Sequence, residues 1–134
     1  MPLKYLLDTK ICIYITKKKP ESVLQKFSEL KVGEVGMSII TYAELQYGAQ
    51  KSQAKKKTIN LLQSLVNFIP VLPMSIDTSE YYADIRAKLE KKGMIIGNND
   101  LWIASHALSL NVSLVTNNLK EFSRVPKLKL ENWV

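Results

Sequence analysis

Short apolar runs alternate with longer stretches of helical periodicity along the whole chain. The apolar runs predict five strands, and the prolines of the third one place it at a sheet edge. These strands are Lys4–Leu7, Gly33–Ser38, Ile69–Pro73, Val112–Val115 and Leu128–Leu130. The stretches between them predict helices over 11–15, 20–30, 41–49, 59–66, 77–93 and 100–110, with a turn or short helix over 116–122.

Several residues mark the ends of these elements. Pro20 suits the first position of the second helix, because its fixed φ matches a helix and its missing N–H is not needed there. Asp77 with Glu80 three residues later is typical of a capping box, and Asn111 is expected to cap the helix 100–110 at its C-terminus. Strands and helices alternate throughout, which predicts an α/β fold: a three-layer α/β/α sandwich with a mainly parallel central sheet, in a single domain over residues 1–134.

Composition agrees with one compact domain in a reducing compartment. The chain has 134 residues, of which 46% are hydrophobic, and this is enough for one core but too short for two. Cys12 is the single cysteine, so no internal disulfide can form, and its apolar neighbours predict a buried, inert thiol. No segment is apolar enough to span a bilayer, and Asp8 comes too early for a signal peptide. We therefore expect a soluble cytoplasmic protein without membrane contact.

The net charge favours a polyanionic partner. It is formally +7, and lysine supplies most of the positive charge. Such a surface attracts nucleic acid, although it can also serve solubility alone. Lysine contacts phosphate as a point charge, so this composition by itself indicates little base specificity.

Four acidic residues lie at positions that the expected fold brings to one edge. Asp8 ends the first strand, Glu44 lies in the helix after the second, Asp100 begins a helix, and Glu121 follows the fourth strand. Ligands of open parallel sheets bind at the carboxyl ends of the strands, where these four residues converge. They are therefore the candidate catalytic residues.

Each acid also has a purely structural explanation. Asp8 could cap the following helix, and Thr41 with Glu44 has the spacing of a capping box. Asp100 could stabilise a helix dipole, and Glu121 could be a solvated surface acid. These explanations stay open at the level of single residues, and the convergence of all four is what favours a site.

Carboxylates gathered in one cleft repel each other, and a divalent cation relieves the repulsion. Mg²⁺ or Mn²⁺ prefers such oxygen ligands and can activate water at a phosphate. Other chemistries are disfavoured by what the sequence lacks. With His106 as the single histidine and Cys12 as the single cysteine, neither a two-histidine ribonuclease nor a Cys/His zinc site can be built. There is also no phosphate-binding glycine loop followed by Lys and Ser or Thr.

Four segments, in order and spanning nearly the whole chain, resemble the PIN-domain toxins of the VapC type. They are Leu6–Thr9, Ser38–Leu45 with Gly48, Ile96–Ala104 and Leu114–Phe122, and the final Glu131–Trp133 is similar as well. The resemblance implies an Mg²⁺- or Mn²⁺-dependent endoribonuclease. Asp8 and Asp100 match the usual metal ligands of that family, and Glu44 and Glu121 complete its acidic centre. Thr9, Thr116 and Asn118 match polar residues that line the site.

The resemblance also implies partners and a substrate. A VapB-type antitoxin would inhibit the toxin, which would form a homodimer inside the complex. Relatives cut tRNA, often initiator tRNA in the anticodon loop, and thereby inhibit translation.

Lys10 departs from the family pattern, which has Asn at that position. A cation there could pair with Asp8 and weaken metal binding, which is the interpretation we favour, or it could point outward to an RNA phosphate. A non-catalytic or attenuated RNA-binding module is therefore the alternative function. A phospho-acceptor receiver domain is a third, but the acidic pair that it needs beside the accepting Asp is missing.

Overall fold

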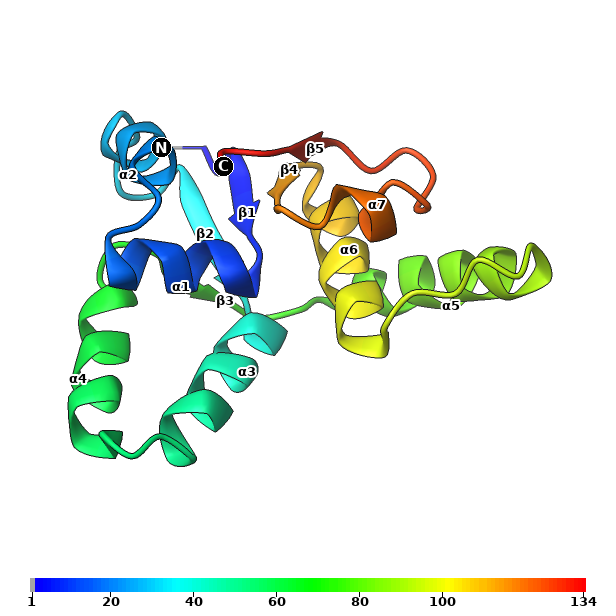
Figure 1. The fold of residues 1–134 in the computed structure, drawn as a ribbon. Coiled ribbons are helices and arrows are strands. Elements are labelled where there is room, and N and C mark those ends of the chain that lie inside the picture. The colour runs from blue at the N-terminus through cyan, green and yellow to red at the C-terminus, as the bar shows by residue number, and fades with distance from the viewer. Residues whose placement is uncertain (1) are drawn as a thin grey trace.

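The computed structural model describes residues 2–134, in which five parallel strands form one central sheet (Figure 1). The strands are β1 (Tyr5–Leu7), β2 (Val35–Ser38), β3 (Val71–Leu72), β4 (Ser113–Val115) and β5 (Leu130–Glu131). The helices are α1 (Thr9–Lys17), α2 (Glu21–Ser28), α3 (Ile39–Gln50), α4 (Lys55–Leu65), α5 (Ile76–Lys91), α6 (Asn98–Leu110) and α7 (Leu119–Phe122). All five predicted strands are present, and β3 lies at the edge of the sheet as its prolines predict.

The sheet separates two hydrophobic cores, which confirms the predicted three-layer sandwich. Side chains of a strand alternate between faces, so Leu6 and Leu7 point in opposite directions. Leu6 packs in a cluster with Ile85 of α5 and Leu101 of α6. Leu7 packs in the other cluster, which contains Leu62 of α4 and residues of α1 and α2. Figure 1 shows α5 and α6 on one side of the strands and α1, α2 and α4 on the other.

The N-cap assignments of two predicted helices are wrong, and Asn111 is confirmed as a cap. Pro20 is the N-cap of α2 and not its first residue, because its ψ of 164° is extended. Ser75, with a ψ of 169°, is the N-cap of α5, so Asp77 lies within the first turn. Asp77 still favours the helix dipole there, but it forms no capping box with Glu80. Asn111 adopts the left-handed conformation with a φ of 56° after α6.

The strand order creates a crevice at the carboxyl end of β1. The order is β3-β2-β1-β4-β5, so β1 pairs with β2 on one side and with β4 on the other. The chain after β1 turns into α1, whereas the chain after β4 leads to α7. Ligands of parallel α/β sheets bind at such a switch point, and here the two strand ends supply Asp8 and Thr116.

Substitution of two glycines by alanine tests how closely β2 and β3 approach each other. A Cβ added to Gly36 would lie 2.7 Å from Leu72 Cδ1 and 3.3 Å from the Pro70 carbonyl oxygen, so Gly36→Ala should destabilise the protein by about 1–3 kcal/mol. Gly48 lies inside α3 with no atom near its added Cβ, so Gly48→Ala should stabilise it by about 0.5–1 kcal/mol. Urea unfolding measures both, and equal effects of the two substitutions would contradict the close approach of β2 and β3.

Candidate active site

Asp8 is fixed at the end of β1 by two hydrogen bonds. Its Oδ1 accepts from the Lys10 backbone N–H at 2.7 Å, so Asp8 is the N-cap of α1, as its structural explanation required. Its Oδ2 accepts from Thr116 Oγ1 at 2.5 Å, across the β1–β4 switch point. The residue is only 7% exposed. Burial raises the pKa of Asp8, although the hydrogen bonds from Thr116 and Lys10 act against the shift.

Glu44 extends from α3 toward the carboxyl end of β1, where Asp8 lies. Thr9 Oγ1 donates to its Oε1 at 2.6 Å, and Asn99 Nδ2 donates to its Oε2 at 3.4 Å. The capping-box explanation of Glu44 is wrong, because α3 begins at Ile39 after the N-cap Ser38. Glu44 is therefore held by neighbouring elements and not by its own helix start.

Asp100 carries the most perturbed carboxyl group in the site. It lies in the first turn of α6, and its pKa is raised to about 7, first by burial and then by the charges of Glu121, Asp8 and Glu44. A carboxyl group ordinarily loses its proton near pH 4, so burial together with the neighbouring negative charges holds the proton on Asp100 to a higher pH. The other three acids are thus close enough to influence Asp100.

Two hydrogen bonds hold Glu121 next to Asp100. Its Oε1 accepts from the Gly97 N–H at 2.7 Å and its Oε2 from Asn118 Nδ2 at 2.9 Å. The Gly97 hydrogen bond is the main reason why the pKa of Glu121 is lowered. A Cβ added to Gly97 would lie 3.5 Å from Glu121 Oε1 and 3.7 Å from Asp100 Oδ2. Both distances are ordinary van der Waals contacts, so Gly97 lies directly beside the two carboxylates.

A cleft of about 460 Å³ contains most of the predicted site. Its lining residues are Asp8, Thr9, Lys10, Ile13, Glu44, Asp100, Asn117 and Asn118. Glu121 lines the adjoining pocket instead, together with Gly97 and Asn118. The structure thus brings three of the four acids into one cleft and places Glu121 beside it, in contact through Asp100.

Thr116 is buried outside the cleft lining, whereas Lys10 is exposed at the rim of the cleft. Thr116 is fully buried and does not line it; its hydroxyl donates to Asp8 and accepts from the Asn118 N–H at 2.9 Å. Lys10 is exposed at the rim, and the ion pairs recorded for residues 2–134 do not include it. The pairing of Lys10 with Asp8 that the sequence suggested is therefore not seen.

Sequence reasoning did not single out two residues of the site. Asn99 holds Glu44, and Asn117 lines the cleft. Both adjoin residues that were identified, and their amide groups were the available signal. By contrast, Cys12 is fully buried as predicted, and burial raises the pKa of its thiol. His106 is also buried and lies outside the cleft lining.

The donor set suits a hard divalent cation with water in its shell. Among the described residues, no three Asp, Glu, His or Cys side chains form a ready-made metal cage. Mg²⁺ commonly binds through one or two carboxylates and retains several waters, so it does not need such a cage. The raised pKa of Asp100 is the observation that favours a cation, because a positive charge would relieve the repulsion.

Comparisons with known proteins show the family of the chain and its fold. Residues 5–128 match the PIN domain family. The chain is 46% identical over 130 residues to Ribonuclease VapC2 of Rickettsia felis, covering 96% of this chain and 97% of that protein. It is 38% identical to the tRNA(fMet)-specific endonuclease VapC of Salmonella typhimurium, covering 98% of each. The VapBC2 structure from Rickettsia felis, bound to a promoter DNA fragment, superposes with a TM-score of 0.92 at 44% identity, covering 98% of this chain and 100% of that one.

Removing the Asp100 charge should stabilise the metal-free protein. The folded protein holds this proton up to about pH 7 whereas the unfolded chain releases it near pH 4, so wild-type stability falls as pH rises between these values. Asp100→Asn should gain about 1–2 kcal/mol at pH 8 in chelator, after allowance for partial exposure, and nothing near pH 4. Thermal unfolding measures the gain.

A matched control and a metal titration complete this test. Asp84 lies on α5, exposed and 3.0 Å from Lys88, so Asp84→Asn should change stability little. Mg²⁺ or Mn²⁺ should raise the Tm of the wild type and not that of Asp100→Asn. An Asp100→Asn protein less stable than wild type in chelator at pH 8 would contradict the crowding of charge.

Proposed function

The chain belongs to the PIN domain family, and we propose that it is a metal-dependent endoribonuclease that acts as the toxin of a VapBC-type toxin–antitoxin pair. The observation that carries this proposal is the single cleft formed by Asp8, Glu44 and Asp100, in which burial and the neighbouring carboxylates raise the pKa of Asp100 to about 7. The ribonuclease names of the relatives support the reaction class.

Asp8 and Asp100 would hold Mg²⁺ or Mn²⁺, with Glu44 and Glu121 completing the acidic centre. The cation, when bound, supplies an activated water and stabilises charge on the phosphate. Thr116 positions Asp8, and Thr9 positions Glu44, through the hydrogen bonds described above. Glu121 accepts from Gly97 and Asn118, which keep it ionised and directed at Asp100. In this arrangement the polar residues orient the acids, and the acids orient the reacting groups.

The proposed substrate is tRNA, with an anticodon loop of initiator tRNA as the specific candidate. The name of the Salmonella relative supports this, because it specifies tRNA(fMet). The net charge of +7 favours a polyanion over a small neutral substrate. Lys10 at the rim of the cleft is placed where it could contact a phosphate that flanks the cut.

The proposed protein partner is a VapB-type antitoxin, as in the VapBC complexes to which the chain is structurally similar. A toxin homodimer within that complex stays part of the proposal. No helix in residues 2–134 is long and apolar enough to cross a bilayer. We place the complex in the cytoplasm, where its proposed substrate is.

Cleavage of an anticodon stem-loop RNA tests the function directly. The wild type should cut it with Mg²⁺ or Mn²⁺, leaving 5′-phosphate and 3′-hydroxyl ends, and should lose activity in chelator. Asp100→Asn should lower kcat by at least about 100-fold, because it removes a proposed metal ligand. Asp84→Asn is the control for a surface charge of the same type. Full cleavage in chelator, or products with 2′,3′-cyclic phosphate, would contradict the mechanism.

Substitution of Lys10 distinguishes a fully active enzyme from an attenuated one. If this cation weakens the metal site, Lys10→Asn should lower the Mg²⁺ concentration needed for half-maximal cleavage. If it contacts RNA, the same change should raise KM and reduce the salt dependence of RNA binding, leaving the Mg²⁺ requirement unchanged. RNA binding by a wild type that cuts nothing, with no effect of metal, would favour the non-catalytic alternative.

A further inference from the structure

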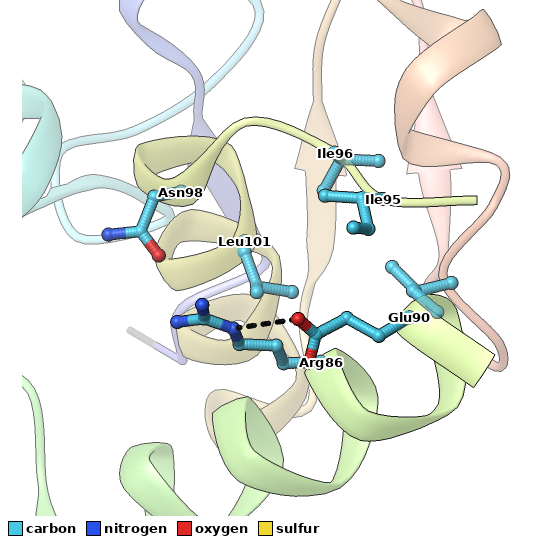
Figure 2. Close-up of a pocket in the computed structure, with 7 residues that line it drawn as sticks. Arg86, Glu90, Ile95, Ile96, Asn98 and Leu101 are labelled. Atoms are coloured by element: carbon cyan, nitrogen blue, oxygen red, sulfur yellow. Dashed lines mark ion pairs between the residues drawn. The ribbon is translucent and has the colours of Figure 1, made fainter. Parts of the chain in front are cut away.

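An apolar pocket of about 230 Å³ lies between α5 and α6, beside the catalytic cleft but outside it. Figure 2 shows Ile95 and Ile96 on one side of it, Leu101 projecting between them and α5, and Arg86 with Glu90 along the α5 side. Pockets for drug-sized ligands measure about 300–1,000 Å³, so this one suits a single ring system rather than a whole nucleotide.

The pocket adjoins the candidate active site through one short segment. Ile95 and Ile96 line both this pocket and the neighbouring one that contains Glu121. The next residue, Gly97, donates its N–H to Glu121 and lies beside the carboxylate of Asp100. Ile95, Ile96 and Gly97 are consecutive in the chain, so the pocket and the acids are next to each other, and a strand cut at the acids can place a neighbouring base here.

The polar groups at the pocket contact one another. Arg86 Nη1 donates to Tyr82 Oη at 2.8 Å, and Arg86 Nε lies 3.8 Å from Glu90 Oε2. Tyr82 in turn donates to Asn98 Oδ1 and stacks on Trp102, with ring centroids 3.8 Å apart. A guanidinium that is oriented in this way offers a flat face for stacking, and Glu90 and Asn98 offer polar atoms to a base edge.

The space between the pocket and the acids is basic. The charged residues that line the neighbouring pocket of about 290 Å³ are Lys120, Arg124 and the site acid Glu121, so two cations face one carboxylate there. Arg124 is oriented by a hydrogen bond from its Nη1 to the Ile95 carbonyl at 2.9 Å. Cations placed between an acidic centre and an apolar pocket fit a phosphate that lies between a cut bond and a splayed base.

We propose that the pocket formed by Arg86, Glu90, Ile95 and Leu101 binds one nucleobase of the RNA strand next to the scissile phosphate. It would thereby select the cleavage position. This inference rests on the proposed ribonuclease function and adds a base-reading subsite to it. Apolar walls with a few oriented polar groups at one side are the arrangement by which single-stranded RNA bases are recognised.

The test removes single bases from the RNA and leaves its phosphates unchanged. An anticodon stem-loop RNA is made with one abasic nucleotide at each loop position in turn, and kcat/KM is measured with Mg²⁺. For the wild type, one abasic position next to the cut should lower kcat/KM roughly tenfold, because the interaction of that base with the pocket is lost. Abasic substitutions at the other positions should have smaller effects.

A pocket-filling variant and a matched control identify where that base binds. Ile95 is 58% exposed, so Ile95→Trp can fill the pocket mouth without disturbing the core. This variant should cut the intact RNA and the sensitive abasic RNA with equal kcat/KM. Met94 is 41% exposed, precedes Ile95 and does not line the pocket. Met94→Trp should keep the roughly tenfold difference of the wild type.

Other outcomes would contradict the base site alone, or the base site together with the proposed function. If Ile95→Trp keeps the tenfold difference, or the wild type has no sensitive position, the pocket is not a base site although the enzyme remains a ribonuclease. If Ile95→Trp instead only weakens inhibition by the antitoxin, the pocket serves the protein partner and the proposal is wrong. If the wild type cuts no RNA under any metal condition, the proposed function fails and the base site fails with it.

Discussion

Negative charge has to be compensated wherever a fold gathers several carboxylates, and the structure around Asp100 follows from that constraint. Burial and the charges of Glu121, Asp8 and Glu44 raise the pKa of Asp100 to about 7. Nearly every other polar residue of the site donates a hydrogen bond to one of these acids: Thr116 and the Lys10 N–H to Asp8, Thr9 and Asn99 to Glu44, and Gly97 and Asn118 to Glu121. Asp100 is left as the acid whose charge is least compensated, and a cation is the natural complement.

The parallel sheet explains why acids that are far apart in sequence meet. Asp8 follows β1 and Thr116 follows β4, and these strands pair directly from Tyr5 with Ser113 to Leu7 with Val115. Their carboxyl ends therefore lie side by side, and the 2.5 Å hydrogen bond from Thr116 to Asp8 joins them. A residue buried in this way can orient a functional side chain although substrate never touches it, and this is the role that the structure gives Thr116.

The fold and the convergence of the four acids could be predicted from the sequence because they depend on local patterns and on one topological rule. Alternating strands and helices give a parallel sheet, and acids at strand ends then share an edge. Side-chain direction is not contained in such patterns. Thr41 and Glu44 have capping-box spacing, but α3 begins at Ile39, and this leaves Glu44 free to accept from Thr9. Likewise, Glu121 is directed at Asp100 from a neighbouring pocket because Gly97 holds it there.

The proposal on which the rest depends is that Asp8 and Asp100 together hold a divalent cation. Anomalous diffraction from crystals grown with Mn²⁺ tests it most directly, because the peak locates the ion independently of any activity. The account predicts a peak within coordination distance, about 2.0–2.2 Å, of a carboxylate oxygen of each residue, with water completing the shell. A well-ordered cleft that shows no peak at saturating Mn²⁺, or a peak bound by other residues alone, would contradict it.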